Sequence, residues 1–363
     1  MHARTTSAPD AAGESERPKN GYLVNPVVEM SGAMIAAQLA NVAARLGIAD
    51  LLKDGPKTVA EVAGATSAHE PSLRRVLRGM ACYGLLREAG PERYELTSLG
   101  TMLRSDSADQ TRSLVMMSCD DSQWQSWGNL LHTVMTGETG FDHAFGMNSF
   151  EYYATRPEVA AEFHQTMAEN TRAIVPGVLA AYPFDGYSTI VDVGGGSGTL
   201  LSEILKALPD TKGVLFDTEH GIRKAGSVLD FAGVADRCAV VAGDFFEAVP
   251  RGGDLYLLKD IVHDWDEDRV RRILSCCREA LPAHGRLLLL EQMLPAVIDE
   301  RAGFRTRATI MADLTMLVST GGRERTETEF ADLLAEAGFT LTGTYAVTAS
   351  NYHLVEARPS TED

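Results

Sequence analysis

The feature that most constrains the fold lies between Tyr187 and Glu291, where five apolar runs alternate with helix-like stretches. The runs read TIVDVGGGSG, GVLFDT, CAVVAGDFF, DLYLLKDIV and RLLLLEQML. They are rich in leucine or β-branched residues and lack polar–apolar alternation, which is typical of parallel strands covered on both faces. Strands of this kind that alternate with helices predict a doubly wound α/β domain.

The residues before Tyr187 predict a mainly helical region. The stretch 27–52, VVEMSGAMIAAQLANVAARLGIADLL, has almost no charge, so we expect either a core helix or a helix at a subunit interface. Residues 58–97 predict two helices and a hairpin around Gly90 and Pro91, which is the outline of a winged helix. Near the end of the chain, TGTYAVTASNYHLVEARP predicts two further strands that form a closing hairpin.

The composition limits which partners and which cellular compartment are expected for the protein. Lysine and arginine total 33 against 50 acids, a net charge of −17, which argues against nucleic acid as a partner. No apolar run approaches the ~20 residues that span a bilayer, and the first twenty residues lack the apolar core of a secretory signal. Five cysteines without CxxC spacing fit a reducing cytoplasm. Arg74, Arg75 and Arg78 on the longer helix keep a winged-helix regulator as an alternative.

The glycine-rich loop VDVGGGSGTL connects a predicted strand to a predicted helix. Its glycines, Gly194 and Gly196 among them, permit a sharp turn and close approach of a ligand to the backbone. The dinucleotide pattern GxGxxG would require a third glycine where Thr199 stands. Asp192, just before the loop, suits a ligand with an ammonium group better than a pyrophosphate.

Two more acids end the next strands of the predicted sheet. Asp217 ends LFDTEH and could accept hydrogen bonds from a ribose diol. Asp244, in AGDFFE, could accept from an adenine amine while Phe245 lies against the ring. Each acid alone could be a loop cap, but three at successive strand ends indicate one ligand. An adenosine with a cationic amino-acid tail and no phosphate fits, which describes S-adenosylmethionine.

The stretch LLKDIVHDWDED, 257–268, places His263 where a predicted strand leaves the core. A packing histidine and a metal ligand beside Asp260 and Asp264 are alternatives, but no second histidine is near, so we predict no metal. An imidazole with pKa ~6.5 is mostly neutral at physiological pH and can accept a proton from a phenol of pKa ~10. Glu291, on the next strand, could hold the other ring nitrogen. Asp266 is expected to cap the following helix.

From about Val27 onward the chain resembles the small-molecule O-methyltransferases of the plant caffeic-acid type and their bacterial relatives that act on aromatic natural products. The resemblance rests on VDVGGGSG, GDFFEAVP, LKDIVHDWDED, LLEQML and GGRERTETEF. It implies a class I methyltransferase sheet preceded by a winged-helix-like dimerisation domain. The loop LTMLVSTGG is one residue shorter than the plant pattern, which leaves the acceptor open.

The resemblance also assigns roles to residues. It makes His263 the catalytic base, with the flanking carboxylates Glu291 and Glu324. It implies cofactor contacts at Gly194, Asp217, Asp244, Phe245 and Lys259, to which the loop adds Asp192 and Gly196. Acceptor contacts are expected at Phe163 and Met167, and we add Asp264 and Met316.

Together these expectations describe a cytoplasmic homodimer that methylates the phenolic hydroxyl of a small aromatic acceptor with S-adenosylmethionine. Neither nucleic acid nor membrane is an expected partner. N-methylation, decarboxylation or hydroxylation by a cofactor-binding relative are the alternatives. The expected domains are a tail at 1–20, the dimerisation domain at 21–110, linker and acceptor-pocket helices at 111–186 and the catalytic domain at 187–358.

Overall fold

The structure is a computed structural model that describes residues 25–107, 110–299 and 302–360. The chain divides into two compact units, Met1–Ser105 and Asp106–Asp363. The expected tail at 1–20 lies outside the described residues. The helices expected as a linker at 111–186 belong to the second unit together with the α/β sheet.

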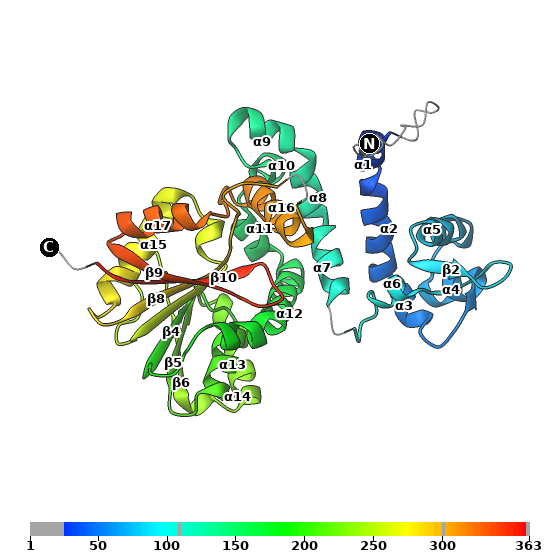
Figure 1. Ribbon diagram of the computed structural model, residues 1–363. Coiled ribbons are helices and arrows are strands. Elements are labelled where there is room, and N and C mark those ends of the chain that lie inside the picture. The colour runs from blue at the N-terminus through cyan, green and yellow to red at the C-terminus, as the bar shows by residue number, and fades with distance from the viewer. Residues whose placement is uncertain (1–24, 108–109, 300–301, 361–363) are drawn as a thin grey trace, which may run out of the picture. The chain divides into compact units, whose positions relative to one another are not determined.

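The first unit joins helices to a small antiparallel sheet of strand order β1-β3-β2 (Figure 1). Helix α4 begins at a capping box in which Thr58 and Glu61 satisfy each other's backbone N–H groups. The hairpin that follows α5 gives the winged-helix arrangement that the sequence predicts. Its elements are α1 (Pro26–Ser31), α2 (Ala33–Arg45), α3 (Ile48–Leu51), β1 (Lys57–Thr58), α4 (Val59–Thr66), α5 (Glu70–Cys82), β2 (Leu86–Glu88), β3 (Arg93–Leu96) and α6 (Ser98–Thr101).

The apolar stretch 27–52 forms three helices, because the chain breaks at Gly32 and Gly47. Helix α1 has no buried residue, and α2 buries only Asn41, Ala43 and Ala44. Val27 and Met30 are 71% and 74% exposed. The interpretation as a core helix is therefore wrong for α1 and the first half of α2, which present an uncovered apolar surface.

The same segment bears on the expectation about membranes. By length and composition, Pro26–Arg45 could cross a bilayer, with a mean hydropathy of 1.3 over its most apolar window. The sequence-based statement that no apolar run approaches that length is thus too strong. Asn41, Ala43 and Ala44 nevertheless lie buried within the first unit, so one side of α2 packs on protein.

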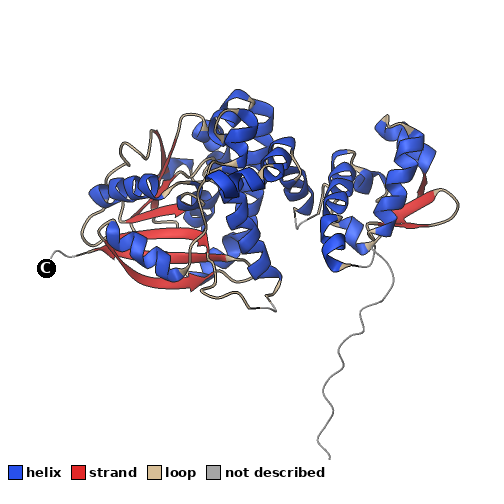
Figure 2. Cartoon of the chain, turned by 90° about the horizontal axis from the view of Figure 1, so that it is seen from above, coloured by secondary structure: helices blue, strands red, loops and turns tan. Residues whose placement is uncertain are grey.

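The second unit is built on a seven-stranded sheet of order β6-β5-β4-β7-β8-β10-β9 (Figures 1 and 2). The first five strands of this order are parallel, and β10 pairs antiparallel with both β8 and β9. The closing hairpin that the sequence predicts is therefore present. The strands are β4 (Thr189–Val193), β5 (Lys212–Asp217), β6 (Cys238–Ala242), β7 (Leu255–Lys259), β8 (Arg286–Gln292), β9 (Phe339–Ala346) and β10 (Tyr352–Pro359).

Helices pack on both faces of this sheet, as expected for a doubly wound domain (Figure 1). One core includes residues of α12 (Pro157–Ala181), α13 (Thr199–Ala207) and α14 (Ala225–Ala232). The opposite core includes residues of α15 (Glu267–Ala280) and α17 (Glu327–Glu336). Strand β6 departs from the expected two-sided burial, because Val240 and Val241 at this edge are exposed.

Asp266 accepts a hydrogen bond from the Arg269 N–H and so caps α15, which confirms the sequence-based expectation. The remaining helices of the unit are α7 (Thr111–Ser118), α8 (Asp121–Gly128), α9 (Leu130–Thr136), α10 (Gly140–Phe145), α11 (Ser149–Thr155) and α16 (Phe304–Ser319).

Candidate active site

The glycine loop leaves β4 and enters α13 through left-handed backbone conformations. Gly194, Gly196 and Gly198 have φ of 74°, 56° and 80°, which residues with a Cβ rarely adopt. A Cβ on Gly195 would lie 2.5 Å from an oxygen of Asp192. Conformation favours glycine at positions 194, 196 and 198, and lack of space favours it at position 195.

Asp192 is a buried carboxylate that faces this loop and is only 1% exposed. Its Oδ2 has no hydrogen-bond partner within the described part of the chain. Burial and the neighbouring Asp217 raise its pKa to about 7, and the Lys259 ammonium opposes that rise. A buried oxygen without a partner is costly, so the position suits a ligand that brings a cationic donor.

Asp217 ends β5 and Asp244 follows β6, the next two strands toward the sheet edge. Asp217 Oδ2 accepts from the Gly196 N–H at 2.8 Å, which ties the end of β5 to the glycine loop. A Cβ on Gly221 would lie 2.3 Å from the same carboxylate. Asp244 accepts from the Phe246 N–H at 2.8 Å, which fixes the turn that presents the partly buried Phe245.

Lys259 ends β7, the strand on the other side of β4. Its side chain is 10% exposed and its Nζ contacts Asp260 Oδ2. The structure thus places Asp244, Asp217, Asp192 and Lys259 at the carboxyl ends of the four consecutive strands β6, β5, β4 and β7. This edge is where α/β sheets bind their ligands.

His263 lies in a short 3-10 turn, Val262–Asp264, that follows β7. Its Nδ1 is 3.0 Å from Glu324 Oε1 and 3.5 Å from Glu291 Oε2. Its Nε2 is 3.7 Å from Asp264 Oδ1. We call Glu291, Glu324 and Asp264 the carboxylate cluster. Glu324, and not Glu291 as the sequence suggested, makes the hydrogen bond to the ring.

Glu291 holds the backbone around the histidine instead. One of its oxygens accepts from the N–H groups of Ile261 and Val262, both at 3.0 Å. The Glu291 side chain is fully buried, and burial raises its pKa to about 8. Two backbone donors and a nearby imidazole are therefore what keep a carboxyl group in this position.

The carboxylate cluster changes the protonation of His263 from the sequence-based expectation. Burial lowers the pKa of His263, but Glu291, Asp264 and Glu324 together raise it well above its ordinary value. The imidazole of the ligand-free site is thus a stronger base than a solvated one. The expectation of a mostly neutral ring assumed an unperturbed pKa and does not describe this site.

Two residues that the sequence reasoning missed hold the His263 turn. Arg325 is 1% exposed and donates to the Val262 carbonyl at 3.0 Å and to Glu267 at 3.0 Å. Gly322 lies so close that a Cβ there would come within 1.9 Å of the His263 carbonyl oxygen. Both belong to the segment GGRERTETEF, whose run of charge and glycine was the available signal.

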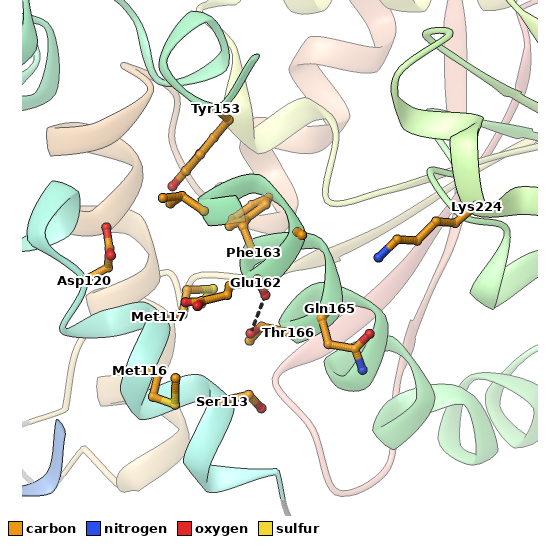
Figure 3. Close-up of a pocket in the computed structure, with 12 residues that line it drawn as sticks. Ser113, Met116, Met117, Asp120, Tyr153, Glu162, Phe163, Gln165, Thr166 and Lys224 are labelled. Atoms are coloured by element: carbon orange, nitrogen blue, oxygen red, sulfur yellow. Dashed lines mark hydrogen bonds between the residues drawn. The ribbon is translucent and has the colours of Figure 1, made fainter. Parts of the chain in front are cut away.

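A cavity of about 420 Å³ opens between α7, α11 and α12 (Figure 3). Figure 3 shows Phe163 and Thr166 on α12 together with Met116 and Met117 on α7 around it. The wall combines apolar and sulfur-containing side chains with a few polar groups, as small-molecule pockets do. Of the expected acceptor contacts Phe163 lines this cavity, whereas Met167, Asp264 and Met316 do not.

Asp260, His263 and Glu291 each bring one possible ligand atom within 4.8 Å of the others, a spacing that could hold a cation. Of these three residues, only His263 supplies a nitrogen ligand, and the Glu291 carboxylate is fully buried. The absence of a metal therefore stays a prediction.

Comparison with known families identifies the chain. A model of the O-methyltransferase domain matches residues 127–340, and a model of the O-methyltransferase dimerisation domain matches residues 28–106. The chain belongs to the O-methyltransferase family. It is 43% identical to the phenazine O-methyltransferase of Lysobacter antibioticus over 88% of this chain and 91% of that protein.

Solved structures of O-methyltransferases agree with this family. The mitomycin 7-O-methyltransferase aligns with a TM-score of 0.86 at 35% identity, over 92% of this chain and 97% of that one. An O-methyltransferase from neocarzinostatin biosynthesis, solved with S-adenosylmethionine and a hydroxy-methyl-naphthoic acid, aligns at 0.79 and 31% identity, over 89% and 96%. Like its family, the present chain uses S-adenosylmethionine as its methyl donor. The class I methyltransferase sheet and the N-terminal dimerisation domain are both confirmed.

Proposed function

We propose that this O-methyltransferase methylates a phenolic hydroxyl of a small aromatic natural product, with His263 as the general base. The observation that carries the proposal is the hydrogen bond between His263 Nδ1 and Glu324 beside the row of strand-end side chains. It leaves Nε2, the other ring nitrogen, to accept a proton when the ring is in its deprotonated form. Phe163, Met116 and Met117 give the cavity beside α12 an apolar wall for an aromatic ring.

Each strand end along the sheet edge would bind a different part of the methyl donor. Asp244 with Phe245, then Asp217, then Asp192 with Lys259 would hold the adenine, the ribose and the amino-acid end of S-adenosylmethionine in that order. The bound donor supplies a methyl group on a positively charged sulfur. His263 takes the proton of the acceptor hydroxyl as the oxygen becomes the nucleophile, and Glu324 and Glu291 stabilise the imidazolium.

The test is a screen of phenols with the purified enzyme and S-adenosylmethionine, followed by mass spectrometry. A gain of ~14 daltons that disappears when the hydroxyl is replaced by hydrogen supports the proposal. A gain that follows an amine would indicate N-methylation instead. Loss of carbon dioxide or gain of oxygen would indicate decarboxylation or hydroxylation, and a gel shift at low salt would indicate a regulator.

Replacing Asp217 by alanine is expected to weaken binding of S-adenosylmethionine by roughly 1–3 kcal/mol, because the ribose hydroxyls lose a charged acceptor. Calorimetry measures the change directly. Asp210→Ala, at an exposed acid before β5, is the control and should bind like the wild type. Unchanged affinity of the Asp217 variant would remove this residue from the site, and NADH should give no signal with either protein.

We also propose that the enzyme is a homodimer in the cytoplasm, paired through the uncovered apolar surface of α1 and α2. Val27, Met30, Met34 and Ile35 are all more than half exposed, and such a patch is unfavourable in water. Sedimentation at micromolar concentration should show a dimer, whereas Met30→Asp with Met34→Asp should produce monomers. Lys53→Asp, in an exposed turn, should leave the dimer intact, and a monomeric wild type would refute the proposal.

A further inference from the structure

A partly buried chain of polar contacts connects helix α12 to the cofactor edge of the sheet. Asn170 on α12 donates to the Tyr352 hydroxyl at 3.2 Å, and that hydroxyl donates to Asp260 Oδ2 at 3.0 Å. The same carboxylate oxygen contacts Lys259 Nζ. The Lys259 ammonium also lies over the Tyr352 ring, 5.2 Å from its centre.

Asp260, which contacts both Tyr352 and Lys259, has an unusual backbone conformation. Its φ is +54°, in the left-handed region that residues other than glycine seldom adopt. Such a conformation persists only where the surroundings enforce it, and it occurs mainly at functional sites. Asp260 is 12% exposed and its N–H donates to the Leu290 carbonyl at 3.2 Å, so backbone and side chain are both fixed.

Lys259 needs such a restraint because acids surround it. Burial raises the pKa of both Asp192 and Asp264 and the Lys259 charge opposes that rise, so the ammonium lies within electrostatic reach of the buried Asp192 and the partly buried Asp264. In the sheet Asp192 pairs with Leu257, and Lys259 lies two residues further along the same face of β7. A freed Lys259 would swing toward Asp192 and neutralise the oxygen that lacks a partner.

We infer that Asp260 and Tyr352 are positioning residues that hold Lys259 away from Asp192, so that this cation and this anion together recognise the zwitterionic end of the methyl donor. The inference rests on the proposed roles of Asp192 and Lys259. It assigns the adenosine end to other strands, because Asp217 ends β5 and Asp244 follows β6. Disturbing the polar chain should therefore affect one end of the ligand only.

Two ligands that differ only at that end give the test. S-adenosylhomocysteine carries the amino-acid tail, and 5′-methylthioadenosine lacks it. Calorimetry on the full chain should show that Asp260→Asn weakens S-adenosylhomocysteine about 10-fold or more, and Tyr352→Phe about 3–10-fold, as expected for losing a charged or neutral hydrogen-bond partner. Binding of 5′-methylthioadenosine should stay within about twofold. Asparagine tolerates the left-handed conformation, so the first change spares the backbone.

Tyr345→Phe is the matched control, because that tyrosine lies in the same hairpin and its hydroxyl also donates to a carboxylate, Glu356, at 3.2 Å. It should leave both affinities unchanged. Asn170→Ala provides a second variant at the far end of the chain of bonds and should weaken S-adenosylhomocysteine in the same selective way. An equal loss for both ligands, or none, would overturn the inference.

A double-mutant cycle separates positioning from direct contact. If Tyr352 acts through Lys259, adding Tyr352→Phe to Lys259→Met should change nothing further, whereas an additive loss would overturn the inference. Asp260→Asn should likewise change nothing further when it is added to Lys259→Met. The buried Oδ1 of Asp260 has no partner among the described residues, so it could contact the ligand directly. Such a contact would make the two losses additive. Failure of the wild type to bind either ligand would refute the proposed function itself.

Discussion

Replacing His263 by alanine is expected to lower kcat by about 10²–10⁴-fold, the usual contribution of a positioned general base. Affinity for S-adenosylhomocysteine should barely change, because the ring lies beyond Lys259 and in contact with the carboxylate cluster. Steady-state kinetics and calorimetry on the same preparation measure the two quantities. A packing histidine would behave differently, with stability and cofactor affinity lost together and kcat per folded molecule kept.

The raised pKa of His263 predicts the direction in which kcat changes with pH. Burial lowers the pKa of His263, but the carboxylate cluster raises it well above the ordinary value, and only the deprotonated ring can accept a proton. The active fraction therefore grows as the pH rises from the ordinary imidazole value of ~6.5 toward the raised pKa. We expect kcat for a phenol of pKa ~10 to keep rising above neutrality, and the alanine variant to lose this dependence.

The acidity of the acceptor supplies the control. A phenol that is already ionised at neutral pH needs no base, so the effect of His263→Ala should grow with the pKa of the acceptor. Glu324→Gln should cause a smaller loss than His263→Ala, because it orients the ring without touching the acceptor, and Glu291→Gln should do the same through the backbone of the turn. A small effect for every acceptor, in a folded variant, would rule out the base assignment.

Replacing Gly322 by alanine is expected to have the second largest effect, a fall in kcat of about 10²-fold. The added Cβ would lie 1.9 Å from the His263 carbonyl oxygen and 2.6 Å from the Asp264 carbonyl carbon, so the turn must move by about an ångström. Misplacement of a reacting group by that distance costs about this much in rate. Kinetics with the best acceptor from the phenol screen measure it.

Gly226→Ala is the matched control, because nothing lies within 4 Å of a Cβ at that position in α14. It should retain both activity and melting temperature. The Gly322 variant should still bind S-adenosylhomocysteine, since Asp192 and Asp217 lie on other strands. Wild-type kcat in the Gly322 variant would show that the turn can yield without disturbing the histidine.

The sheet edge was predictable because its signals are local. Asp192, Asp217, Asp244 and His263 each stand within a few residues of an apolar run, and parallel strands end at one edge. The alternation of strands and helices therefore indicated both the fold and the place of these side chains. Composition did not separate a core helix from an interface helix at 27–52, because both are apolar and only packing distinguishes them.

The contacts around His263 and Lys259 were not predictable, because they join distant parts of the sequence. Glu324 bonds to a ring 61 residues away, and Tyr352 bonds to an aspartate 92 residues away. Their partners depend on how the segment before α17 crosses the His263 turn and on the register of β10 against β8. The raised pKa of His263 follows from the same contacts and was missed for the same reason.

From the place of β10 in the sheet we expect a limit on when the enzyme can become active during its synthesis. Strand β10 lies between β8 and β9, although it is translated after both. Once β8 has been synthesised, one edge of this strand stays unpaired until residues 352–359 of β10 are made. An unpaired strand edge is prone to association with other chains. Tyr352 reaches its site in the same event, so nascent chains without it should carry a misplaced Lys259, and methyl transfer should begin only after that strand is inserted.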